Sequence, residues 1–226
     1  MKKTILLVVV VLGFSFLLAF DANKKMNYGV EVSPEFYWQN TNTNNSNYNK
    51  AESILKLSES AGIFNIYRVN DKISLKSTLG CSFISGESRF YYNPIDAEGQ
   101  QFPETYDRNS FSYTYASVKV MSFYRLPNSF ALGIGGSFFT PISNIRNEYK
   151  SEFYPEINDS FETKRKDLNF FNYSLDAGLD YSISRFRIGV EYNYTIKGLH
   201  KMANGFFKTD HSESRSAKLN IGYLIY

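Results

Sequence analysis

Two absences narrow the possibilities before any pattern is considered. Cys81 is the single cysteine in 226 residues, which excludes an internal disulfide framework and a thiolate zinc cluster. Beyond the first twenty or so residues, no segment approaches the roughly 20 continuous apolar residues that a membrane-spanning helix needs. If the rest of the chain crosses a membrane, it must therefore do so as a closed barrel, because an open sheet edge cannot be satisfied in lipid.

A strong charge of one sign is also missing. The formal net charge is only +3 and the basic residues are spread along the whole chain, which argues against a nucleic-acid partner. Aromatic residues, in contrast, are abundant: the chain has 18 Tyr and 20 Phe, although only 43% of its residues are hydrophobic. This combination suits a protein wall that is apolar on one face only.

The beginning of the chain has the features of an export signal. Lys2 and Lys3 form a basic start, and an apolar run follows over Ile5–Phe20. The predicted organisation is a signal peptide over residues 1–22, cleaved after Ala19 or Ala22, and an outer-membrane β-barrel over residues 23–226. An uncleaved membrane anchor is the alternative, because the apolar run is long for a signal peptide. Either interpretation exports the remainder of the chain.

Apolar and polar residues alternate along most of the exported part, which is typical of strands with one buried face. In a clear example, Phe186, Ile188 and Val190 alternate with Arg187, Gly189 and Glu191. Regular runs lie at about residues 28–38, 72–83, 130–138, 172–181, 186–195 and 217–225, and less regular runs at about 53–69 and 111–126. We therefore expect eight strands.

Short and long connections alternate strictly between these strands. Short turns are expected at residues 70–71, 127–129 and 182–185, and long polar connections at 39–51, 93–110, 141–167 and 196–212. Turns this short allow only antiparallel neighbours. Outer-membrane barrels have short periplasmic turns, longer outer loops and an even strand number. The predicted fold is thus all-β, an eight-stranded antiparallel up-and-down transmembrane β-barrel with short periplasmic turns and long outer loops.

A soluble eight-stranded β-sandwich is the main rival, since it would also show alternation. Aromatic residues at both ends of the apolar faces, such as Tyr28 and Trp38, argue against it because they match the two interfacial girdles of a membrane barrel. The opposite faces carry charges and glycines. These fit the lumen of an eight-stranded barrel, which is only wide enough for side chains.

Charged residues at the predicted lumen parity form the candidate site. They are Glu31, Glu35, Lys56, Lys76, Lys119, Asp176, Asp180, Arg187, Glu191 and Lys218. Because five acids match five bases, the simplest hypothesis is a network of ion pairs that crosses the lumen and seals it, since unpaired buried charge is costly. An ion-selective pore is expected instead to carry a ring of one sign. Parity leaves open which charges meet.

The overall plan resembles the small outer-membrane barrels of the OmpA transmembrane-domain, OmpX and OmpW type. The resemblance covers nearly the whole exported chain and rests on pattern, without a shared motif. One departure is at the end, where such barrels usually finish on a lipid-facing aromatic residue, whereas Tyr226 has the opposite parity to Tyr223. The resemblance implies location in the cell outer membrane, contact with outer-membrane lipid, and insertion by the barrel-assembly machinery.

Catalytic chemistry has little support in the sequence. Only His200 and His211 offer a base at neutral pH, and both fall in the fourth outer loop. Asp210, His211 and Ser212 are consecutive, but adjacent residues on an extended chain point to opposite sides. A deacylating site with Ser212 or Ser214 near His200 has no motif behind it. No catalytic residue, cofactor or metal site is therefore predicted.

Three functional hypotheses follow, in order of preference. The first is a structural or surface-interaction barrel whose outer loops contact an extracellular protein or another surface ligand. The second is a narrow porin-like channel for small solutes or apolar molecules, and the third is a membrane-embedded lipid-modifying enzyme. The mixed aromatic and charged composition of the third loop, residues 141–167, favours the first hypothesis. Its aromatic residues fit a loop resting on the barrel rim equally well.

Overall fold

The computed structural model describes residues 26–39, 49–96, 98–154, 156–164, 172–197 and 214–225. Their strands are β1 (Met26–Gln39), β2 (Lys50–Ile54), β3 (Lys56–Arg68), β4 (Ile73–Tyr92), β5 (Thr105–Arg125), β6 (Phe130–Pro141), β7 (Ile145–Ser151), β8 (Asn158–Thr163), β9 (Asn172–Ile183), β10 (Phe186–Lys197) and β11 (Ser214–Leu224). A 3-10 turn, η2 (Pro127–Ser129), joins β5 to β6. No helix in the described ranges is long and apolar enough to cross a membrane. The expected signal peptide lies outside the described residues.

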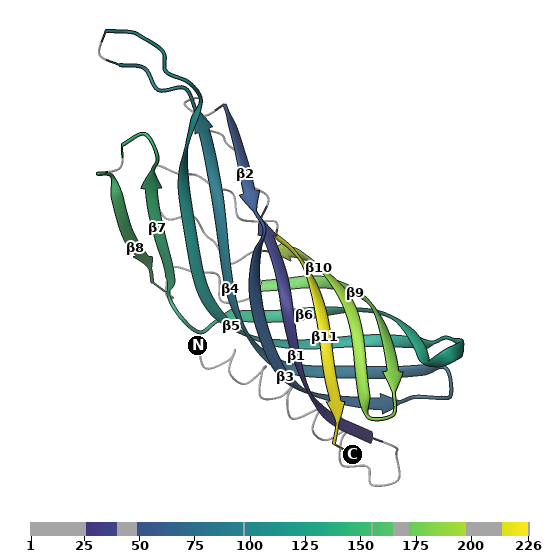
Figure 1. Ribbon diagram of the computed structural model, residues 1–226. Coiled ribbons are helices and arrows are strands. Elements are labelled where there is room, and N and C mark those ends of the chain that lie inside the picture. The colour runs from purple at the N-terminus through teal and green to yellow at the C-terminus, as the bar shows by residue number, and fades with distance from the viewer. Residues whose placement is uncertain are drawn as a thin grey trace.

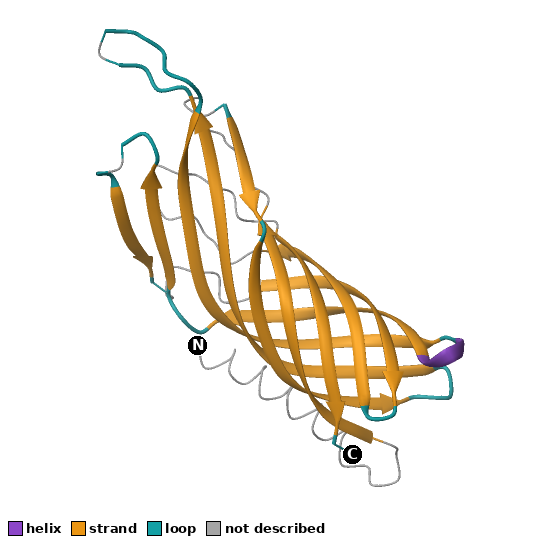
Figure 2. Ribbon diagram, in the orientation of Figure 1, coloured by secondary structure: helices purple, strands orange, loops and turns teal. Residues whose placement is uncertain are grey.

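Eight strands close into a ring (Figures 1 and 2). Its order is β1, β3, β4, β5, β6, β9, β10 and β11, every neighbouring pair is antiparallel, and β11 returns to β1. Closure pairs both edges of every ring strand, which is the condition for crossing lipid with strands. The predicted eight-stranded up-and-down barrel is confirmed.

Three tight turns lie at one end of the ring, together with the start of β1 and the end of β11. The side-chain oxygen of Asn70 accepts hydrogen bonds from the backbone N–H groups of Lys72 and Ile73 at 2.9 and 2.8 Å. Asn128 and Ser184 have left-handed φ angles of 59° and 53°, which tight turns require and which asparagine tolerates well. Short turns mark the periplasmic end of such barrels.

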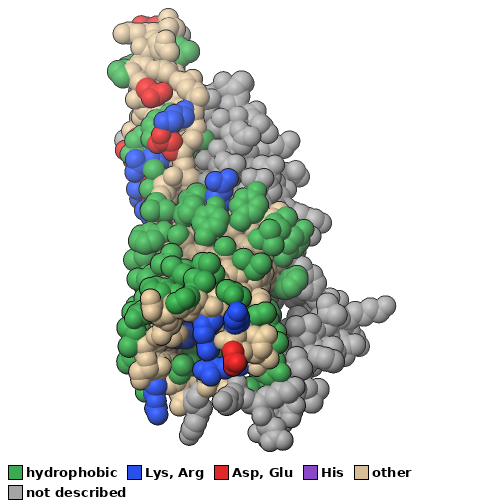
Figure 3. All heavy atoms as spheres, turned by 90° about the vertical axis from the view of Figure 1, so that its right-hand side faces the viewer, with side chains coloured by type: hydrophobic (Ala, Val, Ile, Leu, Met, Phe, Trp, Pro, Cys, Tyr) green, Lys and Arg blue, Asp and Glu red, His purple; other side chains and the backbone are tan. Residues whose placement is uncertain are grey.

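Large apolar side chains cover the outside of the ring (Figure 3). Ile134 is 72% exposed and Val32 is 55% exposed, whereas Glu191 is only 2% exposed. A soluble sandwich would reverse this arrangement, so the barrel faces lipid. Its periplasmic end carries an aromatic girdle made of Tyr28, Tyr67, Tyr124, Phe130, Tyr181, Phe186 and Tyr223. Two pairs in this girdle are in contact, with ring centroids of Phe130 and Tyr181 4.6 Å apart and those of Phe186 and Tyr223 5.2 Å apart.

Several strands continue beyond the ring at the opposite end (Figure 1). β4 and β5 stay paired over their whole length, while β5 pairs with β6 along its ring half and with β7 along its outer half. β2 pairs with the outer end of β4, and β8 pairs with β7. We call the part formed by β2, the outer halves of β4 and β5, β7 and β8 the sheet extension.

The sheet extension corrects the predicted loops. Residues 141–167 were expected to be a long loop, but they contain β7 and β8, and β5 begins at Thr105 inside the expected loop at 93–110. The reason is physical: both faces of β7 and β8 are largely polar, so their backbones pair without the apolar alternation that identifies a strand by sequence. Most of the fourth expected loop, at residues 198–213, lies outside the described part of the chain.

Glycines stand directly opposite large aromatic residues inside the wall. The pairs are Gly29 with Phe64, Gly86 with Phe111, and Gly133 with Phe123. A Cβ atom at any of these glycines would overlap the facing ring. Glycine is therefore required here for space, because each aromatic side chain lies flat across the neighbouring backbone.

Gly133→Val should therefore destabilise the barrel. We expect a loss of about 1 to 3 kcal/mol, because the Phe123 ring must leave its rotamer or the strands must separate. Equilibrium urea unfolding in lipid vesicles, followed by the fluorescence of Trp38, the single tryptophan, measures this loss. Ala177→Val, which adds methyl groups on the exposed outer face, is the control and should change little.

Candidate functional site

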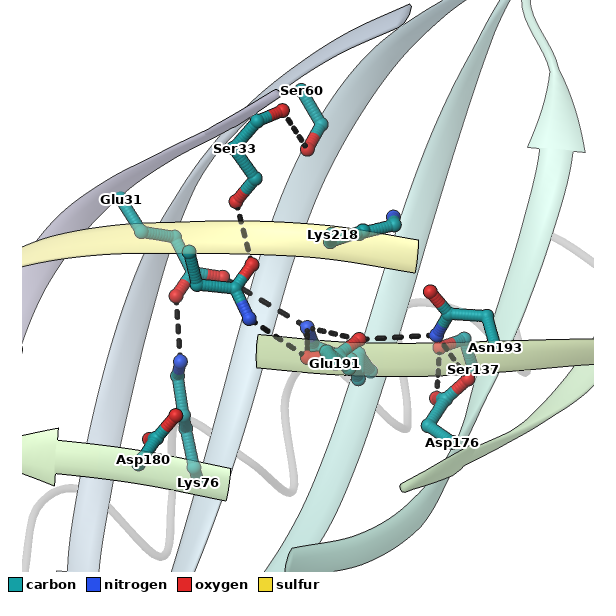
Figure 4. A network of polar contacts seen from close by, with 12 residues as sticks. Glu31, Ser33, Ser60, Lys76, Ser137, Asp176, Asp180, Glu191, Asn193 and Lys218 are labelled. Atoms are coloured by element: carbon teal, nitrogen blue, oxygen red, sulfur yellow. Dashed lines mark hydrogen bonds and ion pairs between the residues drawn. The ribbon is translucent and has the colours of Figure 1, made fainter. Parts of the chain in front are cut away.

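The lumen is crossed by a connected set of buried charges (Figure 4). Glu191 on β10 lies at its centre. Lys119 Nζ on β5 donates to both carboxylate oxygens of Glu191, at 2.9 and 2.6 Å. The amides of Asn193 and Asn220 also donate to this carboxylate, at 3.0 and 3.1 Å. Glu191 is thereby held by donors from three strands.

The same set reaches the other side of the barrel. Lys76 Nζ on β4 lies 2.6 Å from Glu31 Oε2 on β1, and Lys119 Nζ lies 4.0 Å from Glu31 Oε1. Lys119 therefore bridges Glu31 and Glu191. All four side chains are at least nine-tenths buried, so this line of alternating charge spans the lumen away from bulk water.

Two further ion pairs flank this line. Lys218 Nζ lies 3.1 Å from Glu35 Oε2 as an ion pair, and within the described ranges that oxygen has no partner with hydrogen-bond geometry. Arg187 pairs with Asp180 through Nη2. Each pair joins residues on two adjacent strands, β1 and β11 for the first pair and β9 and β10 for the second.

Two of the ten predicted charges are placed differently from the rest. Asp176 is buried, but its contacts are with neutral donors: Ser137, Ser174 at 2.9 Å and Asn193 at 2.5 Å. Lys56 is not inside the lumen: its side chain is 42% exposed and lies 2.9 Å from Glu87 in the sheet extension. Lys56 is the first residue of β3 and pairs with Tyr37, in register with the rest of the strand.

Two apolar layers above and below the charges were not predicted. Near the periplasmic end the lumen is filled by Phe64, Ile66, Met121 and Phe123, and near the outer end by Tyr37, Ile84, Phe111, Tyr113, Tyr115 and Ile145. The signal for them was the irregular alternation of β3 and β5. Those strands carry large apolar residues on both faces, because the inner face packs against the opposite wall.

A small polar cavity remains between the charged layer and the outer aromatic layer. Its volume is about 60 Å³, room for only a few water molecules. The lining includes Ser33, Ser60, Ser82, Ser117, Ser137, Ser174 and Ser216. The aromatic layer with Tyr113 and Tyr115 borders the cavity on its outer side.

The sheet extension is organised by its own polar contacts. On the face that continues the lumen, Asp107 accepts hydrogen bonds from Tyr92 at 3.1 Å and from Tyr149 at 2.5 Å, which tie β4, β5 and β7 together. On the outer face, Glu87 contacts Lys56 and Arg89. Burial raises the pKa of Glu87, but these two bases outweigh burial and hold the pKa of that carboxyl below its usual value.

The predicted third loop was expected to use its aromatic residues either for contact with another protein or for packing on the barrel rim, and the structure contains aromatic residues of both kinds. Tyr149 is tied to Asp107, and the ring centroids of Phe153 and Phe102 are 5.2 Å apart, so both rest on the molecule itself. Phe161 on β8 is 48% exposed. His200, His211 and Ser212 lie outside the described residues. Within the described ranges, no group of three or more His, Cys, Asp or Glu side chains is placed to hold a metal ion.

Comparison with known proteins gives structural likenesses only. The sequence matches no family model and no curated protein. Ail, the attachment invasion locus protein of Yersinia pestis solved with the heparin analogue sucrose octasulfate, is similar at a TM-score of 0.44 and 12% identity, over 89% of this chain and 99% of that one. Neisserial surface protein A is similar at 0.41 and 13%, over 88% and 97%. The outer membrane protein OprG of Pseudomonas aeruginosa is similar at 0.39 and 8%, over 90% and 97%.

The architecture itself decides the class of protein. A closed ring of eight antiparallel strands, apolar outside, charged inside and with tight turns at one end, is built to span a membrane. The chain is therefore a small eight-stranded β-barrel of the cell outer membrane.

Proposed function

We propose that this barrel is a surface-recognition protein that binds an extracellular protein through its sheet extension. The observation that carries the proposal is the extension itself, a five-stranded sheet held beyond the ring on two unbroken strands, β4 and β5. The lumen favours a role as a rigid support for the sheet extension over a role in transport, since its charges are paired and its ends are packed with aromatic residues. A non-enzymatic role fits the same picture.

The outer edge of β8 is the favoured contact. Among the described strands β8 pairs only with β7, so one row of its backbone N–H and C=O groups has no strand beside it. Such an edge is a template for an extended segment of another protein. Natural edge strands are usually blunted by lysine or proline, and β8, with the sequence NDSFET, has neither.

The chemistry of β8 also defines the partner. Asp159 and Glu162 place negative charge on this strand, and Phe161 offers an exposed apolar ring between them. A segment that adds to this edge is expected to be extended, to carry basic residues and to provide an apolar contact for Phe161. The proposed partner is thus an extracellular protein with an accessible basic β-strand or unfolded segment.

A crosslinking experiment tests this function. A photo-crosslinking residue at Ser160, in cells that display the protein, should capture protein from an extracellular protein mixture, and Phe161→Lys should abolish capture because edge lysines block strand addition. Ile157→Lys, an exposed apolar position beside β8, is the matched control and should leave capture unchanged. Replacing residues 145–163 by a short Gly-Ser linker should abolish capture while the ring still folds, seen as heat-dependent migration on a gel.

Two outcomes would contradict the proposal. Normal capture by the hairpin deletion variant would move recognition away from the sheet extension. Stepwise conductance of the purified protein in planar bilayers would favour the narrow-channel hypothesis, because a lumen sealed by paired charges and packed rings is expected not to conduct.

A further inference from the structure

Basic side chains gather at the periplasmic end of the lumen, on the opposite side of the membrane from the sheet extension. Arg68, Lys72, Arg125 and Arg185 are exposed at the described turns and strand ends there, and Asp71 is the single exposed acid among them. Figure 3 looks onto this end and shows Lys and Arg side chains collected inside the surrounding apolar surface. The charge balance of the inner lumen is therefore not kept at its mouth.

Three of these bases lie on neighbouring strands. Arg68 ends β3, Lys72 precedes β4 and Arg125 ends β5, and the backbone N–H of Arg125 donates to the carbonyl oxygen of Lys72 at 2.7 Å. Arg68 and Arg125 continue the lumen-facing series of their strands, two residues beyond the buried Ile66 and Phe123. Both arginines therefore start from the inner side of the wall.

A fifth base, Arg187, forms the floor of this mouth. Arg187 is only 9% exposed, and its Nη2 donates to Asp180, but its Nε is buried without a hydrogen-bond partner among the described residues. The guanidinium carbon of Arg187 lies 5.6 Å from the centre of the Phe123 ring, so the side chain reaches across the lumen from β10 to β5. On β5, Phe123 is the lumen-facing residue next to Arg125, so the guanidinium of Arg187 lies one lumen-facing position deeper in the barrel than Arg125.

We propose that the periplasmic mouth of the barrel binds a phosphate group between Arg187, Arg125 and Arg68. Guanidinium groups present forked donors that match the oxygens of a phosphate, and charge-assisted hydrogen bonds of this kind are the strong ones. Nε of Arg187 is a buried donor with no acceptor in the described part of the chain, and an oxygen of a bound phosphate would supply that acceptor. This inference is independent of the proposed recognition function.

The phosphate has two possible sources with the same chemistry. One is free inorganic phosphate from the periplasm. The other is the headgroup of a phospholipid in the inner leaflet, because the mouth lies level with the aromatic girdle, in which Tyr67 and Tyr124 are the direct chain neighbours of Arg68 and Arg125.

Titration of the full-length protein in maltoside micelles, which contain no phosphate, tests the site. Inorganic phosphate followed by calorimetry should bind saturably, and the double variant Arg68→Gln with Arg125→Gln should bind at least about tenfold more weakly, since each lost charged hydrogen bond costs more than a tenfold factor. Arg187→Lys, which keeps a charge beside Asp180, should also weaken binding. Arg146→Gln, which removes one exposed base from the sheet extension, should not change it.

Added phosphatidic acid distinguishes the two sources. Displacement of bound phosphate by this lipid would assign the site to a headgroup, and undisturbed phosphate binding would assign it to the free ion. Absence of saturable binding of both probes, or equal binding by wild type and by the folded double variant, would overturn the proposal. Heat-dependent gel migration establishes that each variant has folded.

Discussion

Glu191→Ala is expected to be among the most destabilising single substitutions in this barrel, with a loss of about 3 to 5 kcal/mol. Glu191 accepts from Lys119, Asn193 and Asn220, and it is 2% exposed. After its removal, Lys119 retains only the weaker contact to Glu31 at 4.0 Å. The Lys119 ammonium group is then left buried with little hydration and without its main counter-charge.

The matched control for this variant is an exposed ion pair. Glu162→Ala removes a carboxylate that lies 4.0 Å from Arg146, with both side chains largely in water, and should cost less than about 1 kcal/mol. A double variant, Glu191→Ala with Lys119→Met, should recover part of the loss because it removes the stranded charge. Urea unfolding in vesicles that gave equal midpoints for Glu191→Ala and wild type would mean that the lumen is wet and screened.

Phe123→Ala should have an effect of similar size, about 3 to 5 kcal/mol, because it leaves a cavity in a packed layer. The Phe123 ring is 2% exposed, covers Gly133 and supports the guanidinium of Arg187. Phe161→Ala, on an exposed edge strand, should stay within about 0.5 kcal/mol by the same measurement. A loss at Phe123 no greater than this would show that the periplasmic layer adds nothing to stability.

Alternation identified the strands that touch lipid on one side only. β10 shows why: Ile188 and Val190 face lipid, while Arg187, Gly189 and Glu191 face the lumen, so residue type reports the face directly. β7 and β8 could not be recognised in this way, because neither strand has an apolar face: on β7 the buried positions include the polar residues Asn147 and Ser151. β3 and β5 were blurred by Phe64 and Phe123, apolar residues that fill the lumen.

The candidate site was likewise predicted only in part from the sequence. Parity placed Glu31, Lys119 and Glu191 on the inner face, but it contains no information on which charges meet across the lumen. Lys119 and Glu191 are 72 residues apart in the chain and come together only through the curvature of the closed ring. Lys56 keeps the inner parity of β3, since it pairs with Tyr37. It departs because it is the first residue of that strand, where its side chain is 42% exposed and reaches Glu87, and parity contains no information on where the lumen ends.

The unbroken pairing of β4 and β5 has a mechanical consequence. Their hydrogen bonds run without a gap from the periplasmic turn, where Ile73 faces Tyr124, to the tip of the extension, where Tyr92 faces Thr105. A partner that pulls on the extension away from the membrane applies force along the strand axes. These hydrogen bonds lie across that axis, so the load is shared among many of them in shear and the hairpin cannot open one bond at a time. If the proposed recognition function holds, a cell bound through this protein is held by two paired strands that continue to the far side of its outer membrane.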